Sequence, residues 1–187
     1  PYLHVNRESF MASVLSEAGF HTNPTQQQRN MNAQWKRLEA QSAFWSILQY
    51  NNIARPPVGI ATGFITDVET GLAINGATIT LGQSSYTTDT YETLFHNYSN
   101  NPDELRNGFY YVENLPVAQT LDVMVTANGF YPETTSVTIR SDNFTFLDLQ
   151  MLSSLSPYLI SSTPANGATG ILPNTSVTLN FSRPLLR

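Results

Sequence analysis

The sequence has no cysteine and very little charge. Its 187 residues include one lysine, Lys36, and eight arginines against 14 acidic residues, so 12% are charged and the formal net charge is −5. This charged fraction is about half of the roughly 25% usual in soluble domains. The absence of cysteine excludes disulfides, thiolate metal ligands and a cysteine nucleophile. The scattered arginines make nucleic acid a poor partner, because binding to its backbone needs clustered cations.

Long apolar runs are absent as well. No stretch approaches the roughly 18 consecutive apolar residues of a membrane-spanning helix. Disorder is not expected either, because hydrophobic residues make up 41% of the chain and aromatic residues 11%. In place of charge the sequence has 21 threonines, 17 serines and 17 asparagines. Such short polar side chains are typical of exposed strands and turns, so the composition favours a β-protein.

One long helix is predicted in the first third of the chain. Asn23 precedes Pro24, which is a helix-start signal, and Gln26 stands where a capping-box partner would. The helix is predicted to span about residues 25–50 and to end before Pro56-Pro57. Its apolar positions recur at helical spacing, and we expect its aromatic residues to pack in a core rather than to form a sugar-stacking platform. These positions are Met31, Trp35, Leu38, Phe44, Trp45, Ile47 and Leu48.

After Pro57 the apolar period changes from 3.6 to 2. Turn signals such as Asn75-Gly76 and Asn128-Gly129 separate the alternating segments. About six or seven short strands of this kind predict an all-β sandwich. Residues 89–106 break the rhythm and are predicted to form a longer loop. Alternation returns at the C-terminal end, in Val177, Leu179 and Phe181.

Three regions are therefore predicted, at residues 1–55, 56–153 and 154–187. The last is too short to bury a core of its own. The chain begins at Pro1 rather than Met and stops directly after an alternating pattern. We expect both ends to continue into a longer protein, with only the middle region complete.

Residues 14–24 resemble the signature near the end of the zinc-dependent N-acetylmuramoyl-L-alanine amidases. The matching positions are Glu17, Gly19, Phe20, Thr22 and Asn23, whereas Ser16 stands where an apolar residue is commoner. The resemblance implies a strand at this motif, followed by the last helix of an α/β domain. It also implies that Glu17 is the catalytic glutamate. The family's zinc ligands lie upstream of the motif, so zinc is expected in the parent protein but no ligand in this chain.

Cleavage of an amide by zinc-activated water requires a carboxylate that takes a proton from the water and passes it to the leaving amine. Glu17, beside a glycine that permits close backbone approach, suits that role. The residues around Glu17, taken alone, favour a role in capping the helix or in an ion pair near its start.

The two later regions resemble accessory β-domains. Residues 56–153 are similar to the carboxypeptidase regulatory-like, transthyretin-type sandwich, and residues 154–187 to the start of a bacterial Ig-like domain. The resemblances rest on Gly63-x-Ile65, Ile74-x-Gly76-Ala77-Thr78-Ile79, Gly108-Phe109-Tyr110, Ala127-x-Gly129-Phe130 and Pro164-x-x-Gly167-Ala168-x-Gly170. The expected fold class is therefore mainly β: a transthyretin- or Ig-like sandwich preceded by a strand-plus-long-helix remnant of an α/β amidase domain.

Together these resemblances imply a bacterial cell-wall hydrolase that is secreted, periplasmic or located on the cell surface. It would cleave the N-acetylmuramoyl-L-alanine amide bond of peptidoglycan, with the β-regions positioning it or attaching it to the wall. The isolated chain is expected to be inactive. The alternative is a non-enzymatic surface adhesin or a glycan-binding stalk, which the composition after Pro57 supports. Either reading makes peptidoglycan or another cell-surface glycan the expected partner.

Other candidate site residues have weaker patterns. The histidines show no metal-ligand spacing and are expected in exposed loops. Several tyrosines could line a carbohydrate surface, although adjacent ones on a strand point to opposite faces. A group of acidic residues could bind calcium, but without EF-hand spacing ordinary turn acids are the default. These groups are His4, His21 and His96; Tyr86, Tyr91, Tyr98, Tyr110 and Tyr111; and Asp67, Glu69, Asp89 and Glu92.

Overall fold

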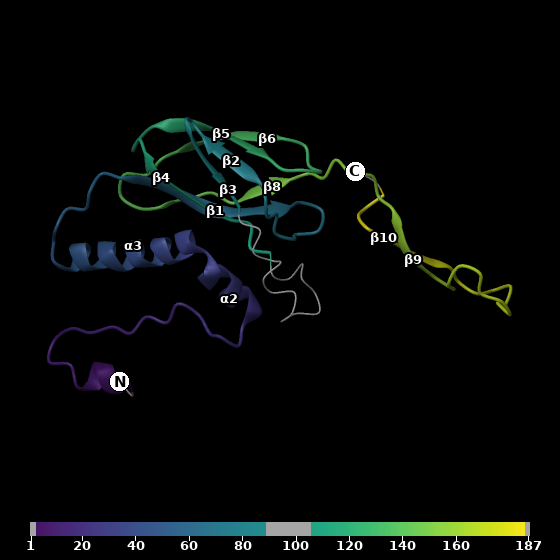
Figure 1. Ribbon diagram of the computed structural model, residues 1–187, viewed down its shortest axis with the longest axis horizontal. Helices are drawn as coiled ribbons and strands as arrows, with labels where there is room; N and C mark the ends of the chain where they lie inside the picture. Colours follow the sequence, from purple (N-terminus) through teal and green to yellow (C-terminus); the bar gives the residue numbers. More distant parts are fainter. Residues whose placement is uncertain (1–2, 89–105, 186–187) are drawn as a thin grey trace.

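The computed structural model describes residues 3–88 and 106–185, and confirms a mainly β protein with a β-sandwich preceded by a helix (Figure 1). Three helices come first: α1 (His4–Arg7), α2 (Pro24–Met31) and α3 (Ala33–Tyr50). Asp89, Tyr91, Glu92, His96, Tyr98 and almost all of the predicted long loop lie outside the described residues. No helix in the described part of the chain is long and apolar enough to cross a membrane.

The sandwich has two sheets. In the first, the long strand β1 (Gly59–Asp67) pairs antiparallel with β4 (Phe109–Leu115) and parallel with β7 (Thr145–Phe146) and β8 (Leu149–Met151). The second is antiparallel throughout, in the order β3-β2-β5-β6. Its strands are β2 (Thr78–Leu81), β3 (Ser84–Thr87), β5 (Thr120–Thr126) and β6 (Glu133–Thr138).

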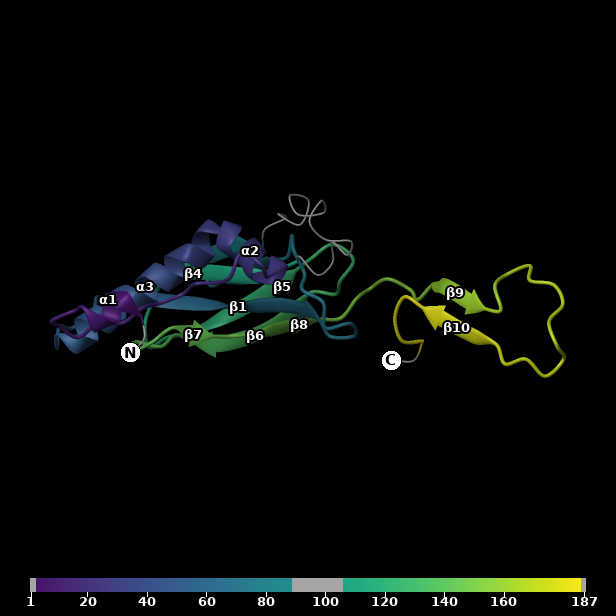
Figure 2. The same ribbon diagram turned by 90° about the horizontal axis from the view of Figure 1, so that it is seen from below.

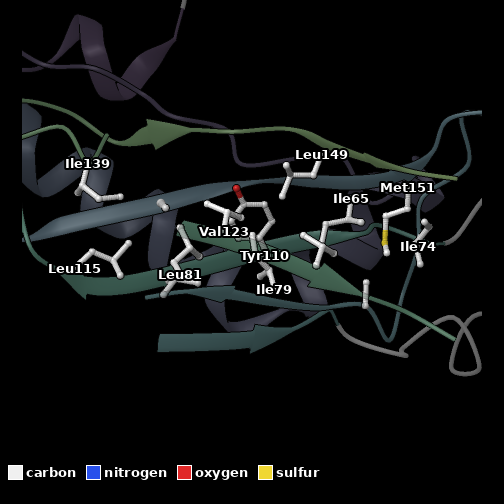
Figure 3. Close-up of a cluster of buried hydrophobic side chains, with 14 residues drawn as sticks. Ile65, Ile74, Ile79, Leu81, Tyr110, Leu115, Val123, Ile139, Leu149 and Met151 are labelled. Atoms are coloured by element: carbon white, nitrogen blue, oxygen red, sulfur yellow. The ribbon is translucent and has the colours of Figure 1, made fainter. Parts of the chain in front are cut away.

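The main core lies between the two sheets. Side chains from β1, β2, β4, β5 and β8 meet there and are almost completely excluded from solvent (Figure 3). The alternation of the second sheet explains this: Ile79 and Leu81 point inward, as do Val123 and Val125. Thr80 and Met124, which lie between them, face outward. This period of two confirms the sandwich expected from the sequence.

Helix α3 covers the outer face of the first sheet. Trp45 is 8% exposed and stacks on Phe144, with 4.3 Å between the ring centroids. Trp35 meets Phe109 edge-on at 5.0 Å. These rings pack with Ile60 and Tyr111 into a second cluster between helix and sheet. Strand β1 is consequently buried on both faces, since one face meets the main core and the other meets the helix.

The helix predicted over residues 25–50 is broken at Asn32. Asn23 caps α2 as expected, accepting a hydrogen bond from the Gln26 amide at 3.1 Å. Asn32 then caps α3 by accepting from the amides of Gln34 (2.8 Å) and Trp35 (3.1 Å). Its side chain is 3% exposed and donates to the Tyr86 hydroxyl at 3.3 Å. The break allows α3 to follow the sheet while Asn32 bonds to the second sheet.

Residues 13–20, which include the strand implied by the amidase resemblance, form neither strand nor helix. A strand needs a neighbour to satisfy its backbone groups, and no sheet lies beside this segment in the described chain. The predicted alternation at the other end is confirmed. Strands β9 (Leu159–Thr163) and β10 (Thr178–Phe181) form a separate antiparallel hairpin that extends beyond the end of the sandwich (Figure 2).

Candidate functional site

Glu17 lies in the extended segment that precedes α2. It is exposed and makes no hydrogen bond or ion pair with any residue in 3–88 or 106–185. Asn23, not Glu17, caps the helix. The structure thus does not show the capping or ion-pairing role that the sequence left open, and the catalytic role stays a prediction.

The segment around Glu17 exposes large apolar side chains. Phe10 is fully exposed, Val14 is 90% exposed and Phe20 is 57% exposed. Residues of this type seldom remain in water unless another surface covers them. In Figure 1 the segment lies on the side of α3 that faces away from the sandwich.

Helix α3 itself has two apolar faces. Trp35, Leu38, Trp45 and Leu48 point to the sheet. Because successive residues turn by about 100° around a helix, a second set projects to the far side and is exposed. This second apolar face carries Ala33, Ala40, Ala43, Phe44 and Ile47, with Lys36 among them. The apolar spacing grouped Phe44 and Ile47 with the residues expected to pack in a core. The structure separates them because only one side of the helix meets the sheet.

The residues that could hold a metal do not converge. His4 and His21 are exposed, and His4 lies 3.9 Å from the carboxylate of Glu8. Within the described ranges, no group of three or more His, Cys, Asp or Glu side chains could hold a metal ion. In the acidic cluster proposed for calcium, Asp67 accepts a hydrogen bond from the Glu69 amide at 2.8 Å. The Glu69 carboxylate pairs with Arg183 at 3.0 Å.

The described tyrosines proposed for glycan contact belong to the packing instead. Tyr110 is completely buried, and its hydroxyl donates to the Leu147 carbonyl at 2.5 Å. Burial raises its pKa, and the negative charge of Asp148 raises it further. Tyr111 is 3% exposed beneath α3, and Tyr86 bonds to Asn32. The burial of Tyr110 and Tyr111 leaves neither ring a free face for stacking on a sugar.

A polar network ties α3 to the sheet. Arg37 forms a 2.6 Å ion pair with Glu113, which also accepts a hydrogen bond from the Tyr111 hydroxyl at 3.2 Å. Burial and the Glu113 carboxylate raise the pKa of Tyr111 to about 12. On α2, the Arg29 guanidinium lies over the rings of Trp35 (5.3 Å) and Phe64 (4.8 Å), and burial lowers its pKa.

An open hollow of about 510 Å³ lies between α3 and the loop that leads into β7. Arg55 lies over the Trp45 ring at 4.1 Å and donates to the Ser141 carbonyl at 2.6 Å. Asp142 accepts two hydrogen bonds from Arg140, which lower the pKa of its carboxyl group. Hydrogen-bond donors and acceptors of Arg55 and Asp142 therefore line the hollow together with apolar side chains. The lining residues are Ser42, Trp45, Ser46, Leu48, Gln49, Ile53, Arg55, Asp142, Asn143 and Phe144.

The Trp45 indole N–H, a buried donor beside this hollow, has no hydrogen-bond partner among residues 3–88 and 106–185. Sequence reasoning did not find the hollow, because its two walls are about 90 residues apart along the chain and no motif connects them.

Comparisons with known proteins identify no family. No protein-family description and no curated protein matches the sequence. Among solved structures, a candidate membrane-associated protein of unknown function from Bacteroides fragilis is 17% identical, with a TM-score of 0.34 over 54% of this chain. A candidate carbohydrate-binding protein from Bacteroides uniformis is 16% identical, with a TM-score of 0.38 over 66% of this chain. The matches span 30% and 52% of those two proteins, and at this level of similarity they do not identify a function.

Proposed function

We propose that this chain joins a catalytic α/β domain of the zinc-dependent N-acetylmuramoyl-L-alanine amidase type to an accessory β-sandwich of a bacterial secreted or surface protein. The observation that most supports this proposal is the pair of apolar faces on α3. One face packs on the sandwich, and the other lies exposed on the same side as the Glu17 segment. A helix shared by two domains has this pattern, because each domain covers one face.

The same arrangement explains the apolar residues before the helix. Phe10, Val14 and Phe20 would be covered by the rest of the catalytic domain, as would Phe44 and Ile47 on α3. Residues 13–20 would then gain the sheet neighbour that their backbone needs and could pair as a strand. The accessory sandwich would be held directly to the catalytic domain by the helix rather than by a flexible linker.

In this proposal Glu17 is the one residue of the chain that takes part in the reaction. Its carboxylate would remove a proton from the attacking water and pass it to the amide nitrogen as the carbon–nitrogen bond breaks. The described residues do not form a zinc site, so the metal and its ligands would belong to the preceding part of the protein.

The test uses the longer protein that contains this chain. Glu17→Gln keeps the size of the side chain but removes the base, so amide cleavage on purified peptidoglycan should fall by about 10²–10⁴-fold. Glu8→Gln is the matched control, because Glu8 is an exposed acid in the same region that pairs with Arg7 at 2.8 Å. Unchanged turnover in Glu17→Gln would remove the catalytic assignment.

A second candidate is a non-enzymatic, glycan-binding stalk, and the hollow beside α3 favours it. Carboxylate, amide and guanidinium groups there could exchange hydrogen bonds with sugar hydroxyls, while Leu48 and Ile53 offer apolar contact. Trp45 can report binding by fluorescence in a Trp35→Phe background, because the chain has two tryptophans. Peptidoglycan glycan fragments without their peptides should change the Trp45 emission. Asp142→Asn should weaken this change, whereas the control Glu133→Gln on β6 should not. No change at millimolar glycan would exclude this site.

A further inference from the structure

We infer that the ion pair between Glu69 and Arg183 is a latch that fixes the orientation of the C-terminal hairpin relative to the sandwich. The two side chains are 114 residues apart in sequence, and their charged atoms lie 3.0 Å apart. They are only 8% and 12% exposed, unlike the other ion pairs of the described residues. This inference does not depend on the proposed catalytic function.

Glu69 is held on a rigid turn at the end of β1. The Asp67 side chain accepts from the Glu69 amide at 2.8 Å, and the Asp67 carbonyl accepts from the Gly71 amide at 2.8 Å. Val68 donates to the Met151 carbonyl of β8 at 3.1 Å, which ties the turn to the neighbouring strand. The carboxylate is therefore a fixed point on the sandwich.

Arg183 is held equally firmly on the hairpin. The preceding residue, Ser182, donates its amide to the Tyr158 carbonyl at 2.9 Å, and its hydroxyl accepts from the Tyr158 amide at 3.1 Å. These two bonds close the base of the β9–β10 hairpin one residue before the arginine. A contact made by Arg183 therefore restrains the position of the whole hairpin.

The hairpin is also joined to the sandwich by the covalent connection through residues 154–157. Ser154 donates to the Gly129 carbonyl at 2.9 Å, and beyond this point Leu155 is 58% exposed. A single connection would leave the hairpin free to rotate about the exposed residues, whereas a second attachment at Arg183 restricts that rotation. Because a nearly buried pair is screened little by salt, the restriction should persist at physiological ionic strength.

The absence of cysteine makes a distance measurement straightforward. Ser136→Cys on the sandwich and Asn166→Cys on the hairpin, both at exposed positions, would carry two spin labels for pulsed electron spin resonance. The latch predicts one narrow distance distribution. Arg183 lies outside the sandwich core, so the sandwich should still fold in the Arg183→Met variant. The distance distribution of this variant should be at least twice as wide. The double exchange Glu69→Arg with Arg183→Glu should narrow it again.

Asp142→Asn is the matched control, because it breaks the exposed Arg140–Asp142 pair and should leave the distribution unchanged. A distribution already broad in the unsubstituted chain, or unchanged by Arg183→Met, would overturn the latch. Neither result would alter amide cleavage in the Glu17 experiment, so the two proposals can fail separately.

Discussion

The Arg37 guanidinium of α3 lies 2.6 Å from the Glu113 carboxylate of β4, which also accepts a hydrogen bond from the buried Tyr111. This contact joins the helix that follows the Glu17 segment to β4, the strand at one edge of the first sheet. Together with Trp35 and Trp45, it makes the helix part of the sandwich, and several measurable consequences follow from that arrangement.

The two faces of α3 should respond differently to truncation. Trp45→Ala removes a ring stacked on Phe144 and should lower the free energy of unfolding by about 3–5 kcal/mol. Phe44→Ala, at the neighbouring position, removes a side chain that is 47% exposed and should cost less than about 1 kcal/mol in the isolated chain. Urea unfolding monitored by circular dichroism measures both, and equal losses would contradict the assignment of the faces.

Alkaline pH should destabilise the contact between helix and sheet. The pKa of Tyr111 is raised from about 10 to about 12 in the folded chain, so folding favours the neutral phenol. Its contribution to stability is complete below pH 10 and is lost as the pH rises through 12. Tyr111→Phe should therefore weaken the decline in stability between pH 10 and pH 12, measured as urea midpoints. An unchanged decline in this variant would show that Tyr111 is not its source.

The break between α2 and α3 depends on one side chain. Asn32→Ala removes both cap hydrogen bonds of α3 and the bond to Tyr86, and should destabilise the chain by about 1–2 kcal/mol. Asn32→Asp keeps the cap acceptor but loses the donor to Tyr86, so it should recover part of the loss. If Asn32→Ala were neutral, the capping account would be wrong.

The segment around Glu17 should be the first to be cut by protease. Residues 9–22 have no helix or strand and expose Phe10, Leu15 and Phe20, which suit chymotrypsin. The connection at residues 51–57, by contrast, is held to the sandwich through Arg55 and Ser141. Mass spectrometry of early fragments should show cuts in 9–22 before any cut in 51–57. The reverse order would indicate that α3 leaves the sandwich readily.

Much of the fold could be predicted from the sequence because it follows from local patterns. The period of two specified the strands of the sandwich, and Asn23 before Pro24 specified the start of α2. The break at Asn32 could not be predicted, since the apolar spacing continues through it and its cause is a bond to Tyr86, 54 residues away. The packing of α3 on the first sheet was missed for the same reason: it depends on Trp45 meeting Phe144 across the fold.

For the candidate site, the sequence supplied the Glu17 motif but not its surroundings. The motif predicted a strand that residues 13–20 do not form, because the described chain gives them no sheet to join. The apolar periodicity of α3 also could not distinguish residues that pack on the sandwich from those on the exposed face. The structure makes that distinction: one face of α3 packs on the sandwich, and the other is exposed on the side of the Glu17 segment.

The most direct test of a helix shared by two domains is the double substitution Phe44→Ser with Ile47→Ser, measured in the isolated chain and in the longer protein. We expect thermal unfolding of the isolated chain to change by less than about 1 kcal/mol, because both side chains are already exposed. In the longer protein the same change should destabilise the catalytic domain by more than about 2 kcal/mol and reduce amide cleavage. A substitution that is neutral in both settings would contradict the account.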